Sequence, residues 1–170
     1  MKKICFIFLC FWGIFLLSVT VAEAQTKIYT VSPCEFIPEQ WAEKQIKVWN
    51  WGTYFLRQDT STEPWYYAPV HLPDNVIIKY VKIHFYDNYD FQFINVKLRR
   101  ANKYDKSSQV IYDVTSLSAF STPVRHEIDT TPENPAYTKT NLSVFNYYLM
   151  LNMSSYGTGL QLVGVTIGYQ

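Results

Sequence analysis

The chain has 170 residues, of which 15 are basic and 14 acidic, so its formal net charge is only +1. This balance, without any long block of like charge, excludes the broad basic surface that nucleic acids or an acidic membrane would attract. We therefore expect no nucleic-acid partner. The unusual property is aromatic content, since Phe, Trp and Tyr make up 18% of the residues and Tyr alone accounts for 14 of them.

The first segment has the order of a secretory signal peptide. Lys2 and Lys3 precede an apolar run over residues 4–21, and Ala22-Glu23-Ala24 places small residues at the two positions that a signal peptidase reads. The alternative is a retained membrane anchor, because a run of about 18 apolar residues is at the threshold for spanning a bilayer. The small residues favour cleavage after Ala24. We expect a secreted or periplasmic mature chain without a membrane span.

The mature chain has the size of one domain. Removal of residues 1–24 from the 170 leaves 146, with 13 basic and 13 acidic side chains once two lysines and one glutamate are gone. A chain of this length buries a core without cross-links. Cys5 and Cys10 leave with the signal peptide, so Cys34 has no partner for an intramolecular disulfide. We expect Cys34 to be a buried thiol; the alternative is an intermolecular link.

After the signal peptide, residues 25–45 show no sustained alternation. They are predicted to form an irregular leader or an edge strand, with one short helix over residues 38–44. Residues 46–170 are predicted to form a single β-sandwich domain. Weaker strand signals within this domain cover residues 46–50, 53–58, 65–70, 109–114 and 124–128.

Four further segments alternate apolar and polar residues with a period of two, which indicates strands with one face toward a core. They cover residues 77–86, 93–99, 143–153 and 163–169. We expect the following side chains to face the core: Ile77, Val81, Ile83 and Phe85; Ile94, Val96 and Leu98; Phe145, Tyr147, Leu149, Leu151 and Met153; Val163, Val165, Ile167 and Tyr169.

The separators between these segments are rich in Asp, Asn, Pro, Ser and Thr, and no helical periodicity is sustained. Many strands joined by polar turns, without alternating strands and helices, are typical of an all-β, antiparallel two-sheet β-sandwich. We prefer a jelly-roll-like arrangement to a fibronectin-like one.

Residues that could carry chemistry are scattered. His71, His84 and His126 show none of the spacings of metal ligands, and the G-x-S-x-G pattern of a nucleophilic serine is absent. Glu127 and Asp129 alternate in one strand, but a sandwich of this size has little chain for the deep cleft that a carboxylate pair needs. We therefore assign no catalytic residue, no metal site and no cofactor, and expect a protein that is not an enzyme.

The aromatic residues carry the functional hypothesis. Tyr and Trp combine a large apolar face with a polar edge, which suits contact with sugar rings and protein surfaces. The alternative is core packing, because aromatic residues are also good strand formers. Adjacent residues of one strand cannot all face the core, so some of the set must be exposed. The candidate ligand-binding residues are Trp49, Trp51, Trp65, Tyr66 and Tyr67.

Three segments carry a resemblance: Ala68-Pro69-Val70-His71-Leu72-Pro73, Tyr86-Asp87-Asn88, and Gly164-Val165-Thr166-Ile167-Gly168-Tyr169. They resemble the A-P-V-x-L-P, Y-x-D-N and G-V-x-I-x-Y segments of uncharacterised bacterial secreted all-β proteins, to which no function is attached. Those proteins usually have glycine after the turn, where this chain has Asn75. Asn also tolerates a positive φ, so the turn is expected to persist. The resemblance implies the fold and no chemistry.

Together these observations predict a secreted, non-catalytic binding module. Its partner would be a glycan or a protein surface, bound through exposed Trp and Tyr. The alternative is a self-associating structural subunit of an extracellular or cell-surface assembly, because near-zero net charge does not oppose the formation of a homo-oligomer.

Overall fold

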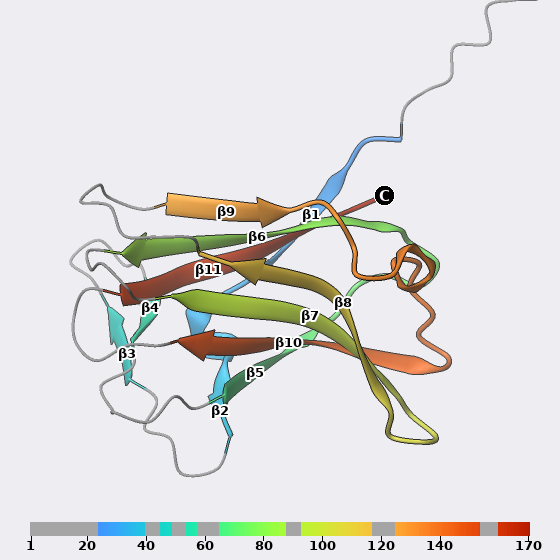
Figure 1. Cartoon of the computed structure of the whole chain (residues 1–170), viewed down its shortest axis with the longest axis horizontal. Helices are drawn as coiled ribbons and strands as arrows, with labels where there is room; N and C mark the ends of the chain where they lie inside the picture. Colours follow the sequence, from blue (N-terminus) through green and yellow to red (C-terminus); the bar gives the residue numbers. More distant parts are fainter. Residues whose placement is uncertain are drawn as a thin grey trace, which may run out of the picture.

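The computed structural model describes residues 24–39, 45–48, 54–57, 65–87, 93–116, 125–153 and 160–170. These residues form two antiparallel sheets that enclose one core, and Figure 1 shows β9, β6 and β11 above β7, β10 and β5. The predicted fold class, a jelly-roll-like β-sandwich, is confirmed. Among the described residues, no helix is long and apolar enough to cross a membrane.

In the described part of the chain, one sheet has six strands and the other has five. The six-stranded sheet has the order β3 (Gln45–Val48), β4 (Tyr54–Arg57), β11 (Leu160–Tyr169), β6 (Ile78–Asp87) and β9 (Arg125–Asp129), with β1 (Lys27–Val31) also paired to β11. The five-stranded sheet has the order β2 (Ile37–Pro38), β5 (Trp65–Val70), β10 (Phe145–Met153), β7 (Ile94–Asn102) and β8 (Ser108–Thr115). Two short 3₁₀ helices, η1 (Pro33–Glu35) and η2 (Pro135–Tyr137), lie between strands.

From β5 onward the chain passes from one sheet to the other at nearly every connection, with β7 and β8 as the exception. Earlier in the chain, β3 and β4 also pair antiparallel within one sheet. Neighbours in space are therefore distant in sequence. The middle strand of the five-stranded sheet, β10, pairs with β5 on one side and β7 on the other. This arrangement brings the outward side chains of three separate segments onto one surface.

The core confirms most of the predicted inward faces. Ile94, Val96 and Leu98 of β7 are fully buried, as are Leu149 and Leu151 of β10. Because successive strand residues point to opposite faces, the intervening residues face outward. The core is therefore built by alternation that is visible in the sequence.

Two β-bulges in the β6–β11 pair overturn two details of this prediction. One register shift lies between Gly168 and Tyr169, so Ile78 enters the core with 1% exposure while Ile77 is 42% exposed. The other lies between Leu162 and Gly164, so Leu162 is buried and Val163 is only half-buried. An extra residue in one strand reverses the alternation beyond it, and a strict period of two does not anticipate this.

The leader of the domain contains an edge strand, since β1 pairs with the C-terminal part of β11. The predicted burial of Cys34 is wrong, because its thiol is exposed. In η1 the residue that enters the core is Pro33, and the Cys34 Sγ lies 3.1 Å from the Ser32 Oγ at the surface. The predicted helix over residues 38–44 begins in a strand at Pro38, and its residues 40–44 lie outside the described part of the chain.

Candidate ligand-binding face

The outer face of the five-stranded sheet gathers the aromatic residues of two strands. In β5, Tyr66 and Ala68 are fully buried, so Trp65 and Tyr67 point outward and are half-buried. In β10, Tyr147 faces the core and the neighbouring Tyr148 faces outward. The sequence alternation of two strands therefore supplies three aromatic side chains to one surface.

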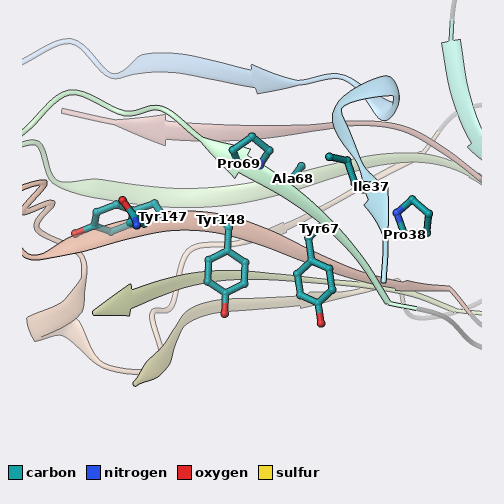
Figure 2. Close-up of a pocket in the computed structure, with 8 residues that line it drawn as sticks. Ile37, Pro38, Tyr67, Ala68, Pro69, Tyr147 and Tyr148 are labelled. Atoms are coloured by element: carbon teal, nitrogen blue, oxygen red, sulfur yellow. The ribbon is translucent and has the colours of Figure 1, made fainter. Parts of the chain in front are cut away.

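Tyr67 and Tyr148 form a pair on this surface. Their ring centroids are 6.1 Å apart and the ring planes are inclined by 42°. Figure 2 shows both rings projecting to the same side of the sheet with their hydroxyl groups pointing away from the ribbon. The Tyr148 hydroxyl is 2.7 Å from the Ser108 Oγ in β8. Two adjacent half-buried rings with polar edges form a small amphipathic platform.

The Tyr67 hydroxyl donates a hydrogen bond to the Glu39 carboxylate. Burial, and secondarily the negative charge of Glu39, raise the pKa of Tyr67 above its ordinary value of 10.0. Tyr67 thus combines a partly buried ring with a hydroxyl group that interacts with an acid at the edge of the platform.

Two shallow hollows border the platform. The first, of about 460 Å³, lies between Ile37 and Pro38 of β2 and the segment that contains Tyr67, Pro69 and Tyr148. Figure 2 shows its lining residues. The second, of about 360 Å³, continues from it and is also lined by His71 and Leu72 after β5, by Lys103 after β7 and by Phe145 at the start of β10. Both hollows share Pro69, Asn146 and Tyr147, so they form one shallow depression along β5 and β10.

Pro69 explains why this edge of the sheet stays open. The short strand β2 pairs with β5 at Tyr66 and Tyr67 and, among the described residues, does not extend further. Proline has no backbone N–H to leave unpaired, and it is therefore found at edges of sheets. Pro69 thus lies on the part of β5 that β2 leaves unpaired.

Polar groups lie on the other side of the platform. Arg99 of β7 lies directly opposite Tyr148. Its Nη1 is 3.3 Å from the Sδ of Met150, a weak acceptor, and its buried Nε has no hydrogen-bond partner among the described residues. The Arg99 side chain is half-buried, so part of its guanidinium reaches the surface although the Nε itself is buried.

The polar side chains next to Arg99 on this face have more hydrogen-bond partners. The Lys97 Nζ donates to the Asp113 Oδ2 at 2.6 Å, and the Asn95 Nδ2 donates to the Thr115 Oγ1 at 2.7 Å. Asn152 lies opposite Asn95, and its buried Oδ1 has no partner in the described part of the structure. Buried polar groups are normally satisfied, so a spare donor and a spare acceptor on one face are informative.

The predicted binding residues divide into three groups. Trp65 and Tyr67 lie on the face, whereas the structure removes Tyr66 from the set because its ring lies in the core. The physical reason is the alternation of β5, which cannot present three consecutive side chains to solvent. Trp49 and Trp51 lie outside the described residues.

Sequence reasoning missed Tyr148 and Arg99. The signal for Tyr148 was present, because the alternation that sends Tyr147 and Leu149 inward sends Tyr148 outward. The proximity of Arg99 has no such signal, since 49 positions separate it from Tyr148 and only the β7–β10 register joins them.

The three histidines do not meet in one place. The register of β6 and β9 places His84 opposite His126, and the His84 Nε2 is 2.9 Å from the Thr166 Oγ1. His71 instead borders the second hollow beside the five-stranded sheet. Among the described residues, no group of three or more His, Cys, Asp and Glu side chains could hold a metal ion.

Comparison with known proteins finds similar structures but no similar sequence. No protein family matches the sequence, and no curated protein does. Among solved structures, the C-terminal CBM6 of LamC, a marine laminarinase from Zobellia galactanivorans, is 10% identical with a TM-score of 0.53, covering 83% of this chain and 98% of that one. A xylan-binding module, CBM15, is 10% identical with a TM-score of 0.50, covering 85% and 97%.

A third similar structure contains the CBM22-1 and GH10 modules of a Clostridium thermocellum xylanase. It is 12% identical with a TM-score of 0.50, covering 85% of this chain and 28% of that one. At such low identity these likenesses show the β-sandwich fold alone.

Proposed function

We propose that this protein is a non-catalytic module that binds a glycan on the outer face of its five-stranded sheet. The observation that carries the proposal is the Tyr67–Tyr148 pair, two half-buried rings 6.1 Å apart beside an open depression. Aromatic rings with an apolar face and a polar edge suit the apolar faces and hydroxyl rims of sugars. Arg99 and Asn152 lie on the same face, and each has one buried polar atom without a hydrogen-bond partner among the described residues.

The structural comparisons favour a glycan over a protein surface as the partner. Two of the solved structures with this sandwich are a CBM6 of a laminarinase and a xylan-binding module. A sugar chain also fits the local geometry, because the depression is shallow, elongated and open at the edge that Pro69 leaves unpaired.

The test is binding of soluble polysaccharides to the isolated mature protein, by affinity electrophoresis followed by calorimetry. A panel should include laminarin, xylan and pectic polymers. We expect Tyr67→Ala and Tyr148→Ala each to weaken binding about tenfold or more, which corresponds to about 1.4 kcal/mol of binding free energy.

The matched control is Tyr80→Ala, which removes another half-buried tyrosine from the outer face of the six-stranded sheet. Circular dichroism verifies that all three variants are folded. Equal binding by all variants, or no binding of any polymer by the wild type, would overturn the proposal.

We also propose that the protein acts outside the cytoplasm, on the basis of the signal-peptide pattern over residues 1–24. N-terminal sequencing of the exported protein should give a chain that begins at Gln25. A product that retains residues 4–21 would contradict this proposal and indicate a membrane anchor.

A further inference from the structure

We propose that the bound glycan carries carboxylate groups, as in a uronic-acid polysaccharide, and that Arg99 is the residue that binds the carboxylate. This inference rests on the proposed function and names the class of its ligand. Its basis is a cation without a counter-charge beside the tyrosine platform.

Lys97, Arg99 and Arg100 are three neighbouring cations of β7, and they differ in the groups that contact their charges. Lys97 forms an ion pair of 2.6 Å with Asp113. The Arg100 guanidinium lies 3.8 Å from the centroid of the Tyr137 ring and 4.2 Å from that of Phe145, and its Nε donates to Gln109. Arg99 has no ion pair and no ring stacked on its guanidinium among the described residues. Its hydrogen bond goes to the weak acceptor Met150 Sδ, and its charge also acts on the nearby Tyr67 hydroxyl.

Arg99 is half-buried, and its Nε is buried without a partner in the described part of the structure. A charge that is partly removed from water without a counter-charge lowers stability. Such a cost is offset when an anion binds. The planar fork of a guanidinium matches a carboxylate, since two parallel N–H donors can meet its two oxygens.

The acidic side chains of this face interact with groups other than Arg99. Asp113 is paired with Lys97. Glu39 accepts the hydrogen bond of the Tyr67 hydroxyl at the β2 side of the sheet. Arg99 belongs to β7, two strands away from β5 in the strand order, and neighbouring strands are about 4.8 Å apart. Neither acid forms an ion pair with Arg99 among the described residues.

The position of Arg99 also suits a ring stacked on the platform. Its backbone lies directly opposite that of Tyr148 in the β7–β10 register. A sugar ring that rests on Tyr148 would therefore place a ring substituent beside the guanidinium. The flexible Met150 side chain, which contacts the Nη1, would move aside.

The experiment compares acidic polymers with their own neutral forms. Polygalacturonate and glucuronoxylan are each tested before and after chemical reduction of the carboxyl groups to alcohols, by calorimetry at two salt concentrations. We expect the wild type to bind the acidic form about tenfold or more tightly than the reduced form. Arg99→Gln should lose this preference, and Arg99→Lys should retain part of it.

The matched control is Lys82→Gln, which removes one positive charge from the outer face of the six-stranded sheet. It should leave the preference unchanged, and circular dichroism verifies folding. If the wild type binds acidic and reduced forms equally, and Tyr67→Ala weakens both, the carboxylate inference fails while the proposed function stands. If no polymer binds, both fail. If Arg99→Gln weakens the two forms equally, Arg99 has only a structural role.

Discussion

Two buried tyrosine hydroxyl groups show how single residues affect the stability of the sandwich at alkaline pH. Tyr112 is 1% exposed, and its hydroxyl donates a 3.0 Å hydrogen bond to the Ile78 carbonyl. Burial, and secondarily the negative charge of Asp129, raise the pKa of Tyr112 to about 12. The Tyr147 hydroxyl instead accepts a hydrogen bond from the Asn141 N–H. Burial also raises the pKa of Tyr147.

Tyr112→Phe should therefore change the alkaline stability of the protein. In the wild type the unfolded chain releases the Tyr112 proton near pH 10 and the folded chain only near pH 12. The folded state binds more protons in this window, so the free energy of unfolding falls as pH rises through it. The variant should show a shallower fall in urea unfolding between pH 9 and 11.5, and lose about 1 kcal/mol at pH 7.

The control for this prediction is Tyr104→Phe, because Tyr104 is 79% exposed. Its stability curve should follow that of the wild type. An unchanged slope in the Tyr112 variant would show that other groups, such as Tyr147, account for the alkaline loss.

Cys34 gives a second prediction at the same scale. Because the thiol is exposed in the folded protein, it should react with a chromogenic disulfide reagent in native buffer to the same extent as in denaturant. Any dimer that forms on oxidation of the mature protein should disappear in Cys34→Ser. A thiol that reacts only in denaturant would contradict the exposed position.

At the scale of elements, the turn before β6 is held by a residue far along the chain. Thr140 is 1% exposed, and its Oγ1 accepts from the Val76 N–H at 2.9 Å and donates to the Pro73 carbonyl at 2.8 Å. Asn75 within this turn has a φ of 59°, which confirms that asparagine adopts the positive φ expected there. The turn and the segment before β10 therefore form one unit.

Thr140→Val should destabilise this unit. The substitution keeps the shape of the side chain but leaves the Val76 N–H and the Pro73 carbonyl without their partner. We expect a loss of about 1–3 kcal/mol in the free energy of unfolding, measured in urea. Thr140→Ser keeps the hydroxyl and is the matched control, with a smaller loss. Equal losses in both variants would assign the effect to packing of the methyl group.

At the scale of the whole molecule, the order of the strands determines how the chain folds. β1 pairs with β11 from Lys27 opposite Tyr169 to Val31 opposite Val165, so the two ends of the domain lie together. β10 joins β5 and β7, and β11 joins β6 and β4. Loop-closure entropy must be overcome before such distant pairs form, which slows folding.

We therefore expect refolding of the mature protein on the millisecond-to-second scale, followed by tryptophan fluorescence after dilution from urea. Refolding from briefly unfolded protein separates this phase from slower proline isomerisation. Complete refolding within about 0.1 ms would show that local contacts dominate the transition state.

From residue 45 onward, the sequence by itself determined the strands and most of their inward faces, whereas it left residues 25–45 as a leader or edge strand. Alternation is a local property of the pleated chain, so Val96 and Leu98 could be placed in the core from their spacing. For residues 65–67 it required only that not all three side chains face the same way, and the structure decided that Tyr66 is the buried one. Alternation could not place Ile77 or Val163, because a bulge depends on how two strands meet.

Only the tertiary structure decided what stands beside Tyr67. Tyr148 reaches it through the β5–β10 pairing and Arg99 through the β7–β10 pairing, and both pairings join segments that are far apart in the chain. Periodicity states which way a side chain points but carries no information about which strand lies next to it. The platform and its unpaired cation therefore arise from strand order and register, which the whole core fixes at once.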